Sequence, residues 1–181
     1  MAYKLNNKTK TIQKEDKSLN YNRLSHNWNV WFHKSNDNNW DFNSYIKLTK
    51  FDNIESYGVI MNTFKPCHIQ NAMLFIMKNN IKPMWEADEN KNGSCISFKI
   101  YKNNIYNAWI QLNNHLISEQ ILKDENNENL NEKINGISIS PKKTFSIIKI
   151  WFSDNSNYIS LLNNINLFNT DEAIFKKHIE N

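Results

Sequence analysis

Short segments in which apolar residues alternate with polar ones, or run on without a break, recur along the chain and predict β-strands. The clearest is 145–152, FSIIKIWF, and in 27–32 the side chains of Trp28, Val30 and Phe32 fall on one face. Further strands are predicted over 45–48, 72–78, 94–102, 137–139 and 173–175. Asn79-Asn80 predicts a tight turn, because Asn tolerates the left-handed backbone conformation better than most residues.

Apolar residues at helical spacing mark three other segments. Ile54, Tyr57 and Met61 recur at helical intervals, with Asp52 as the predicted N-cap and Glu55 three residues further on. The other two helices are predicted over 105–121 and 158–168. Because single helices lie between strands joined by short turns, the pattern predicts an α+β domain in which helices cover one face of a single antiparallel sheet of seven or eight strands.

The composition is that of a folded, mildly basic protein. The chain has 181 residues, a formal net charge of +4 and 13% aromatic residues, too many aromatics for a disordered chain. Residues 1–22 are polar and are expected to form a flexible tail, which leaves 23–181 as one domain. No apolar run approaches the roughly 20 residues of a membrane span, so no membrane association is expected.

The two cysteines, Cys67 and Cys95, are expected to be reduced thiols in a cytoplasmic or nuclear protein, because no secretory signal precedes them. Their spacing fits no metal site, and three glycines leave no phosphate-binding glycine loop. The sequence therefore predicts neither an enzyme nor a bound metal or cofactor.

The six tryptophans are the main candidates for function. Trp28 and Trp109 fit a core, because they lie on apolar faces of a strand and a helix. Trp40 follows a polar segment and Trp85 precedes one. Both positions favour exposed rings on which a nucleobase can stack. Glu86, next to Trp85, could accept from the two adjacent N–H groups of a guanine edge. A solvated loop carboxylate is the alternative interpretation of Glu86.

Several segments, in order, resemble the eukaryotic translation initiation factor 4E family. Residues 28–32, WNVWF, are similar to its first-strand pattern W-x-L-W-F, and 51–55, FDNIE, to its first-helix pattern F-D-T-V-E. Residues 83–93, with PMWE followed by Asn90, Lys91 and Gly93, resemble its signature. Trp40, Trp109, Gly136 and Trp151 also fall at the family's spacing. The resemblance runs from about Leu24 to Phe175 and identifies the chain as a divergent member.

This resemblance implies a 4E-like cap-binding fold, a curved antiparallel sheet of about eight strands with three helices on its convex face. It implies that Trp40 and Trp85 sandwich the 7-methylguanine of the mRNA 5′ cap. Methylation makes this base cationic, so the two indole faces would prefer it to plain guanine. Glu86 would accept from N1 and N2, the Trp85 backbone N–H would donate to O6, and Trp151 would pack near the methyl group.

The resemblance also implies a phosphate site, but one with fewer basic residues than the family usually has. Lys142 stands where the family has an arginine, and Lys143 adjoins it. Lys149 is a third candidate, although alternation within 148–150 leaves open which face it points to. Cys95 and Ile147 occupy positions at which the family has further basic residues. Lysine gives a point charge in place of the bidentate grip of arginine.

On the helical face, the sequence departs from the family's binding site for a peptide of its scaffold partner, factor 4G. Gly58 stands in place of a key Trp and Asn114 in place of a Leu, while Ile54 and Ile110 remain as apolar anchors. Loss of an aromatic anchor typically weakens binding by about 2–4 kcal/mol. The usual peptide is therefore expected to bind weakly or not at all, and a non-standard scaffold protein is the expected partner.

The function predicted by the resemblance is binding of capped mRNA in translation initiation, by a monomer in the cytoplasm and also in the nucleus. Three alternatives stay open at this point. The protein could occupy caps without recruiting ribosomes and so repress translation. It could be a degenerate interaction module without cap affinity, or a general binder of single-stranded nucleic acid.

Overall fold

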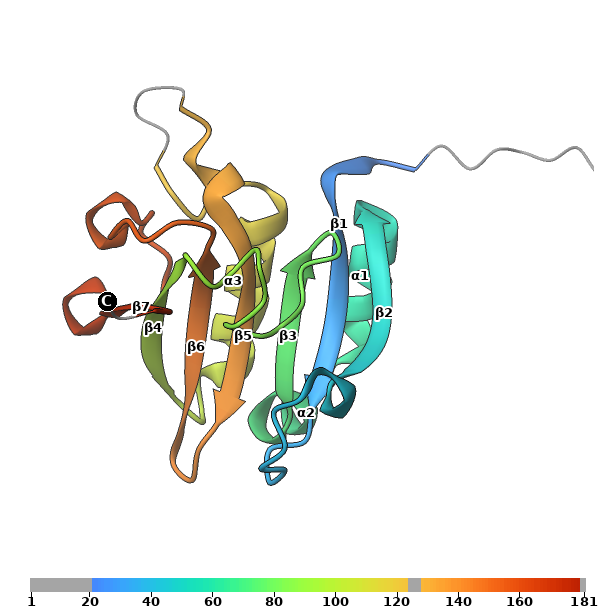
Figure 1. The fold of residues 1–181 in the computed structure, drawn as a ribbon. Coiled ribbons are helices and arrows are strands. Elements are labelled where there is room, and N and C mark those ends of the chain that lie inside the picture. Colours follow the sequence, from blue (N-terminus) through green and yellow to red (C-terminus); the bar gives the residue numbers. More distant parts are fainter. Residues whose placement is uncertain (1–20, 124–127, 180–181) are drawn as a thin grey trace, which may run out of the picture.

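The computed structural model describes residues 21–123 and 128–179, which form one antiparallel sheet with helices packed on one face (Figure 1). The strands are β1 (Arg23–His33), β2 (Ile46–Asn53), β3 (Met73–Lys78), β4 (Ser94–Tyr101), β5 (Ile134–Pro141), β6 (Phe145–Phe152) and β7 (Ile174–Lys177). The helices are α1 (Ile54–Thr63), α2 (Pro66–Asn71) and α3 (Ile105–Ile117). The predicted tail over residues 1–20 lies outside the described residues.

The seven strands lie in the order β2-β1-β3-β5-β6-β4-β7, and every neighbouring pair is antiparallel. This confirms the α+β class and the curved antiparallel sheet, with seven strands instead of about eight. Each predicted strand is present, and β6 has the predicted bounds. None of the helices within the described residues has the length and apolar character needed to span a membrane.

Two apolar clusters lie on opposite faces of the sheet. The larger fills the space between the sheet and the helices and includes Trp28, Val30 and the fully buried Trp109. The smaller consists of Trp31, Phe75, Met77 and Trp151. Successive residues of a strand point to opposite faces, so β1 contributes Trp28 and Val30 to one cluster and Trp31 to the other.

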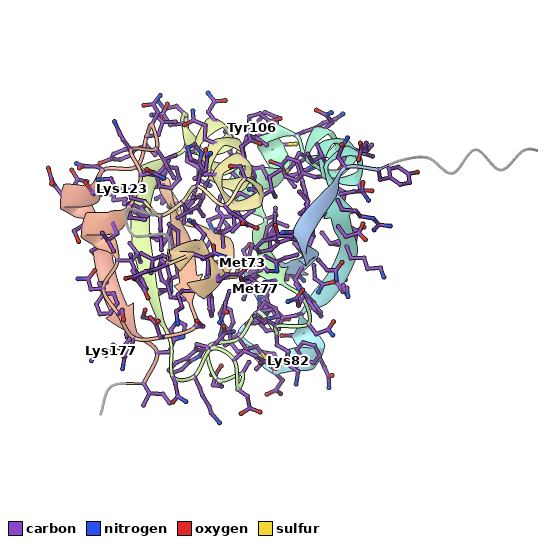
Figure 2. All side chains as sticks on the ribbon, turned by 90° about the horizontal axis from the view of Figure 1, so that it is seen from above. Met73, Met77, Lys82, Tyr106, Lys123 and Lys177 are labelled. Carbon is purple, nitrogen blue, oxygen red and sulfur yellow. The ribbon has the colours of Figure 1, made fainter. Side chains whose placement is uncertain are left out.

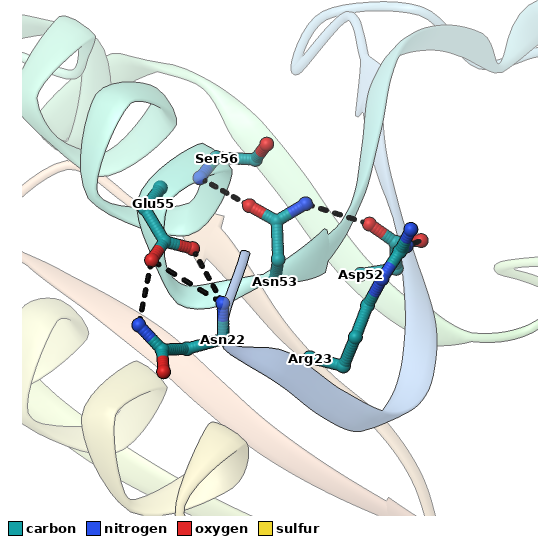
Figure 3. A network of polar contacts seen from close by, with 6 residues as sticks. All are labelled: Asn22, Arg23, Asp52, Asn53, Glu55 and Ser56. Carbon is teal, nitrogen blue, oxygen red and sulfur yellow. Dashed lines mark hydrogen bonds and ion pairs between the residues drawn. The ribbon is translucent and has the colours of Figure 1, made fainter. Parts of the chain in front are cut away.

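The start of α1 differs from the prediction. Asp52 still belongs to β2, and the cap is Asn53, whose side chain accepts a hydrogen bond of 2.8 Å from the Ser56 backbone N–H (Figure 3). Glu55 does not complete a capping box: it accepts from the side chain of Asn22 at 2.7 Å. Asn22 and Arg23, which pairs with Asp52, thus tie the start of β1 to the start of α1.

The helix predicted over 158–168 is wrong, and only Ile159–Leu161 forms a short 3-10 turn. Its backbone pairs with another segment instead: Lys123 N–H donates to Leu161 O at 2.8 Å, and Asn163 N–H donates to Ile121 O at 2.9 Å. A positive φ of 73° at Leu167 also excludes a continuous helix. The third helix is instead α2, which the sequence signalled by Pro66 at its first position.

The last residue of β3, Lys78, is a buried cation. Lys78 is almost fully buried, and its Nζ donates to the backbone oxygen of Glu132 at 2.8 Å and to its carboxylate at 3.0 Å. His26 Nε2 lies 2.9 Å from the other carboxylate oxygen. Burial acts to raise the pKa of Glu132, but the hydrogen bonds and charges of Lys78 and His26 together more than offset this and hold the pKa below its usual value.

Replacing Glu132 by Gln is expected to lower the free energy of unfolding at neutral pH by about 1 kcal/mol, a small value because the carboxylate is partly exposed. Since the folded-state pKa lies below the ordinary value of 4.5, the contribution is complete above that pH and is lost as the pH falls through the folded-state pKa. Urea unfolding at about pH 7 and about pH 3 should therefore show a smaller difference between wild type and Glu132→Gln at the lower pH. Glu172→Gln, an exposed control, should match wild type at both, and a difference that does not shrink in acid would contradict this assignment.

Candidate functional site: an aromatic hollow on the sheet

A hollow of about 570 Å³, called here the main hollow, opens on the face of the sheet opposite the helices. Its rim comes from the β1–β2 and β3–β4 loops, and its floor comes from the central strands. Six of the seven residues predicted to contact the cap line it: Trp40, Trp85, Glu86, Lys142, Lys149 and Trp151. The seventh, Lys143, is exposed beside Lys142 and does not line the hollow.

The floor of the main hollow is set by strand register. Lys149 pairs with Ser138 and lies two residues from Trp151, so both of these β6 side chains point to the hollow. This settles the face of Lys149, which alternation alone left open. Trp151 is 6% exposed and donates from Nε1 to Ser138 Oγ at 2.9 Å, which fixes its ring.

Gly136 lies beside Trp151 in the register, and its lack of a side chain is required. A Cβ there would come within 2.4 Å of the backbone oxygen of Ile76 and within 3.0 Å of the Met77 Cα. The close approach of β5 to β3 under the main hollow therefore depends on glycine.

Trp40 is half exposed, at 50%, and one face of its indole is covered. The imidazole of His33 stacks on it with ring centroids 4.5 Å apart and planes within 5° of parallel. His33 Nε2 lies 2.8 Å from Asn39 O, and because a carbonyl can only accept, Nε2 carries the proton. Sequence reasoning missed His33, whose only signal was its place directly after the aromatic segment 28–32.

The β3–β4 loop that carries Trp85 and Glu86 is held from inside by Asn90. This side chain is fully buried and donates to Lys82 O at 2.9 Å and to Met84 O at 2.7 Å. Asn135 of β5 donates in turn to Asn90 Oδ1 at 2.9 Å. The loop is therefore anchored to the sheet, although Trp85 itself is 52% exposed.

The charge of Glu86 reaches the inside of the main hollow. Tyr45 lines the hollow, and burial together with the Glu86 carboxylate raises the pKa of its hydroxyl to about 12. Tyr45 thus stays protonated at neutral pH and can donate a hydrogen bond. The hollow combines a carboxylate on one side with Lys142 and Lys149 on another, between apolar and aromatic walls.

The four residues predicted for the helical face lie away from the main hollow, on α1 and α3. Ile54 is exposed, Ile110 is half-buried, and the space around Gly58 is open, with no atom within 4 Å of an added Cβ. Asn114 accepts a hydrogen bond of 2.6 Å from the hydroxyl of Tyr57. A polar contact between α1 and α3 therefore stands where the resemblance predicts an apolar anchor.

One group of potential metal ligands occurs among the described residues, formed by His26, Glu119 and Glu132. The ammonium of Lys78 already contacts the Glu132 carboxylate at 3.0 Å, so we assign this group to an ion-pair network. Cys67 is an exposed free thiol and Cys95 a buried one, as predicted.

The fold and the main hollow define the class: an α+β protein that presents an aromatic hollow on a curved antiparallel sheet. The model of the family described as eukaryotic initiation factor 4E matches residues 23–179. The chain therefore belongs to the eukaryotic initiation factor 4E family.

Curated relatives and solved structures show how far this chain diverges. Initiation factor 4E of Eremothecium gossypii is 26% identical over 153 residues, which cover 81% of this chain and 70% of the relative. Factor 4E-1 of Caenorhabditis elegans is 25% identical over 138 residues, 72% of this chain and 62% of the relative. Factor 4E-3 of C. elegans, solved with the 4E-binding protein Mextli and cap analog, has a TM-score of 0.65 at 21% identity and covers 74% of this chain and 75% of that chain. Factor 4E-3 of Ascaris suum, solved with m7G cap, has a TM-score of 0.62 at 20% identity and covers 74% of each chain.

Proposed function

We propose that this protein is a non-enzymatic factor of translation initiation that binds the 5′ cap of mRNA in the main hollow. The observation that carries the proposal is that Trp40, Trp85 and Glu86, from two separate loops, line one hollow. The family membership and the solved relatives with bound cap analog or m7G cap support it.

The base would stack between the indoles of Trp40 and Trp85. Since His33 covers one face of Trp40, the base takes the other face. A desolvated cation between aromatic faces gains about 2 kcal/mol or more, and N7 methylation supplies that cation. Trp151, on the floor, would pack near the methyl group. Plain guanine lacks the charge, so the hollow favours the methylated base.

The edge of the base would be held by Glu86, whose carboxylate can accept from both N1 and N2. The phosphate groups would meet Lys142 and Lys149, which line the main hollow. Lys143, exposed next to Lys142, remains a proposed phosphate contact only for a ligand that extends past the rim. With lysines alone, this grip relies on point charges.

The helical face would meet a protein partner, and a solved relative carries a 4E-binding protein. Gly58 offers no side chain to such a partner, and Asn114 is engaged by Tyr57. These two features favour a non-standard scaffold over the usual peptide, and they keep a cap-occupying repressor as the second candidate function. Either role would be cytoplasmic, where translation takes place.

Tryptophan fluorescence titrations with 7-methyl-GTP and GTP test the proposal, and Glu86→Gln sharpens the test. We expect wild type to prefer the methylated nucleotide, and Glu86→Gln to bind it roughly 10- to 100-fold more weakly, because a hydrogen bond to a charged group contributes about 1.5–3 kcal/mol. Glu89→Gln, an exposed carboxylate of the same loop, is the matched control and should behave as wild type.

The other outcomes of these titrations each contradict the proposal. Equal, weak binding of both nucleotides would indicate a general binder of single-stranded nucleic acid. No response to either nucleotide would indicate a degenerate module without cap affinity. Unchanged affinity in Glu86→Gln would remove Glu86 from the site.

A further inference from the structure

Outside the main hollow, the sheet carries a separate cluster of aromatic and basic side chains, formed by Lys99, Tyr101 and Phe145 and called here the outer platform. Tyr101 ends β4 and pairs with Phe145, which begins β6. The Nζ of Lys99 lies 5.2 Å from the ring centroid of Tyr101 and 5.0 Å from that of Phe145. One ammonium group is therefore held against two aromatic rings.

Strand register puts the outer platform on the same face of the sheet as the main hollow. Ile147 and Lys149 of β6 line the hollow. Alternate residues of a strand share a face, so Phe145 lies on that face as well. Residues directly opposite one another on paired strands also project to the same face, which adds Lys99, the partner of Ile147, and Tyr101, the partner of Phe145.

The outer platform is open to a ligand because the edge strand stops short of it. β7 pairs with residues 94–97 of β4, so Tyr101 lies past the paired stretch, and its side chain is 58% exposed. The helices pack on the other face: Figure 2 shows Tyr106 of α3 on one side of the strands and Lys82, from the β3–β4 loop, on the other.

The charges around the outer platform favour a polyanion. Within residues 21–123 and 128–179, Lys99 forms no ion pair, so its ammonium group is available to a ligand. Lys142 lines the main hollow, and its backbone N–H donates to Phe145 O at 2.8 Å, so this lysine lies between the hollow and the platform. Bases stack on aromatic rings, and ammonium groups bind phosphate through charge-assisted hydrogen bonds. Rings and lysines together therefore fit single-stranded RNA.

We propose that the outer platform binds nucleotides that follow the cap in a capped RNA, with Tyr101 as the ring on which a base stacks and Lys99 as a phosphate contact. This inference rests on the proposed function, because the cap in the main hollow is what brings the following nucleotides past Lys142 to the platform. Since two rings already hold the Lys99 ammonium in place, little further ordering is needed when it binds a phosphate.

The test is calorimetric titration of the full-length chain with 7-methyl-GTP, which ends at its phosphates, and with a short capped oligoadenylate. We expect Tyr101→Ala to bind the capped oligoadenylate at least about fivefold more weakly, the lower end of the range for a base stacked on an aromatic ring. Its affinity for 7-methyl-GTP should not change. Tyr101→Phe keeps the ring and should behave as wild type. Lys99→Gln should lower the slope of log affinity against log salt by roughly 0.7, the value for one phosphate of a single strand, with the capped oligoadenylate only.

Tyr21→Ala is the matched control, because it removes another exposed tyrosine, which precedes β1 and lies several strands away from β4 in the sheet. An equal loss of affinity for the capped oligoadenylate in this control would overturn the inference. Unchanged binding of that RNA by Tyr101→Ala would overturn it as well, and so would a loss of the same size with 7-methyl-GTP. If wild type failed to prefer 7-methyl-GTP over GTP, the proposed function would be wrong, which is a separate result.

Discussion

Replacing Trp85 by Ala is expected to weaken binding of 7-methyl-GTP by about 100-fold and to remove most of the preference over GTP. The variant loses one stacking face, which contributes about 1–3 kcal/mol per base, together with its share of the cation–π energy. Fluorescence is unsuitable as the only readout here because the variant removes a reporting ring, so calorimetric titration with both nucleotides is the measurement.

The fold should not depend on Trp85, because the ring is 52% exposed on a loop whose anchor is Asn90. The free energy of unfolding of Trp85→Ala is therefore expected to stay within about 0.5 kcal/mol of wild type. Trp85→Phe, the conservative control, keeps an aromatic face and should recover part of the preference. Full discrimination by Trp85→Ala would show that the base binds elsewhere.

Replacing Trp109 by Ala, unlike replacing Trp85, is expected to lower stability. The expected loss is about 3–5 kcal/mol in the free energy of unfolding, the usual range for a large buried aromatic. Trp109 is fully buried where α3 packs against the sheet. Urea unfolding monitored by circular dichroism measures the loss.

Trp109→Phe separates packing from hydrogen bonding at this position. The indole Nε1 of Trp109 has no hydrogen-bond partner among the described residues, so its removal sacrifices no bond. The Phe variant should therefore be much more stable than the Ala variant. A change below about 1 kcal/mol for Trp109→Ala would contradict the placement of this ring in the core.

Trp85 and Trp109 also show how much could be predicted from the sequence alone. Neighbouring residues were enough to separate them, because Trp109 lies on an apolar helical stripe and Trp85 is followed by charged and polar residues. The same local signals predicted β6 with its observed bounds. The helix over 158–168 was wrong because its spacing is helical while its backbone hydrogen bonds go to residues 121–123. Periodicity does not reveal such a competing partner.

The residues of the candidate site also fall into two groups, those that the sequence could indicate and those that it could not. Trp40, Trp85, Glu86 and Trp151 could be proposed from the sequence because motif and composition mark them locally. His33 could not, because its role depends on how the β1–β2 loop packs over the end of β1. The sheet order β3-β5-β6 is not the order of the chain, and it is this order that brings Trp151 of β6 and the β3–β4 loop to one hollow.

The sequence by itself determined the fold class, the strands and the resemblance to the family, since each follows from residue spacing along the chain. Only the tertiary structure decided that Lys149 faces the main hollow and that His33 covers one face of Trp40. The physical reason is that strand pairing and register, together with the packing of loops over the sheet, set which side chains meet, and these are long-range interactions that no local pattern records.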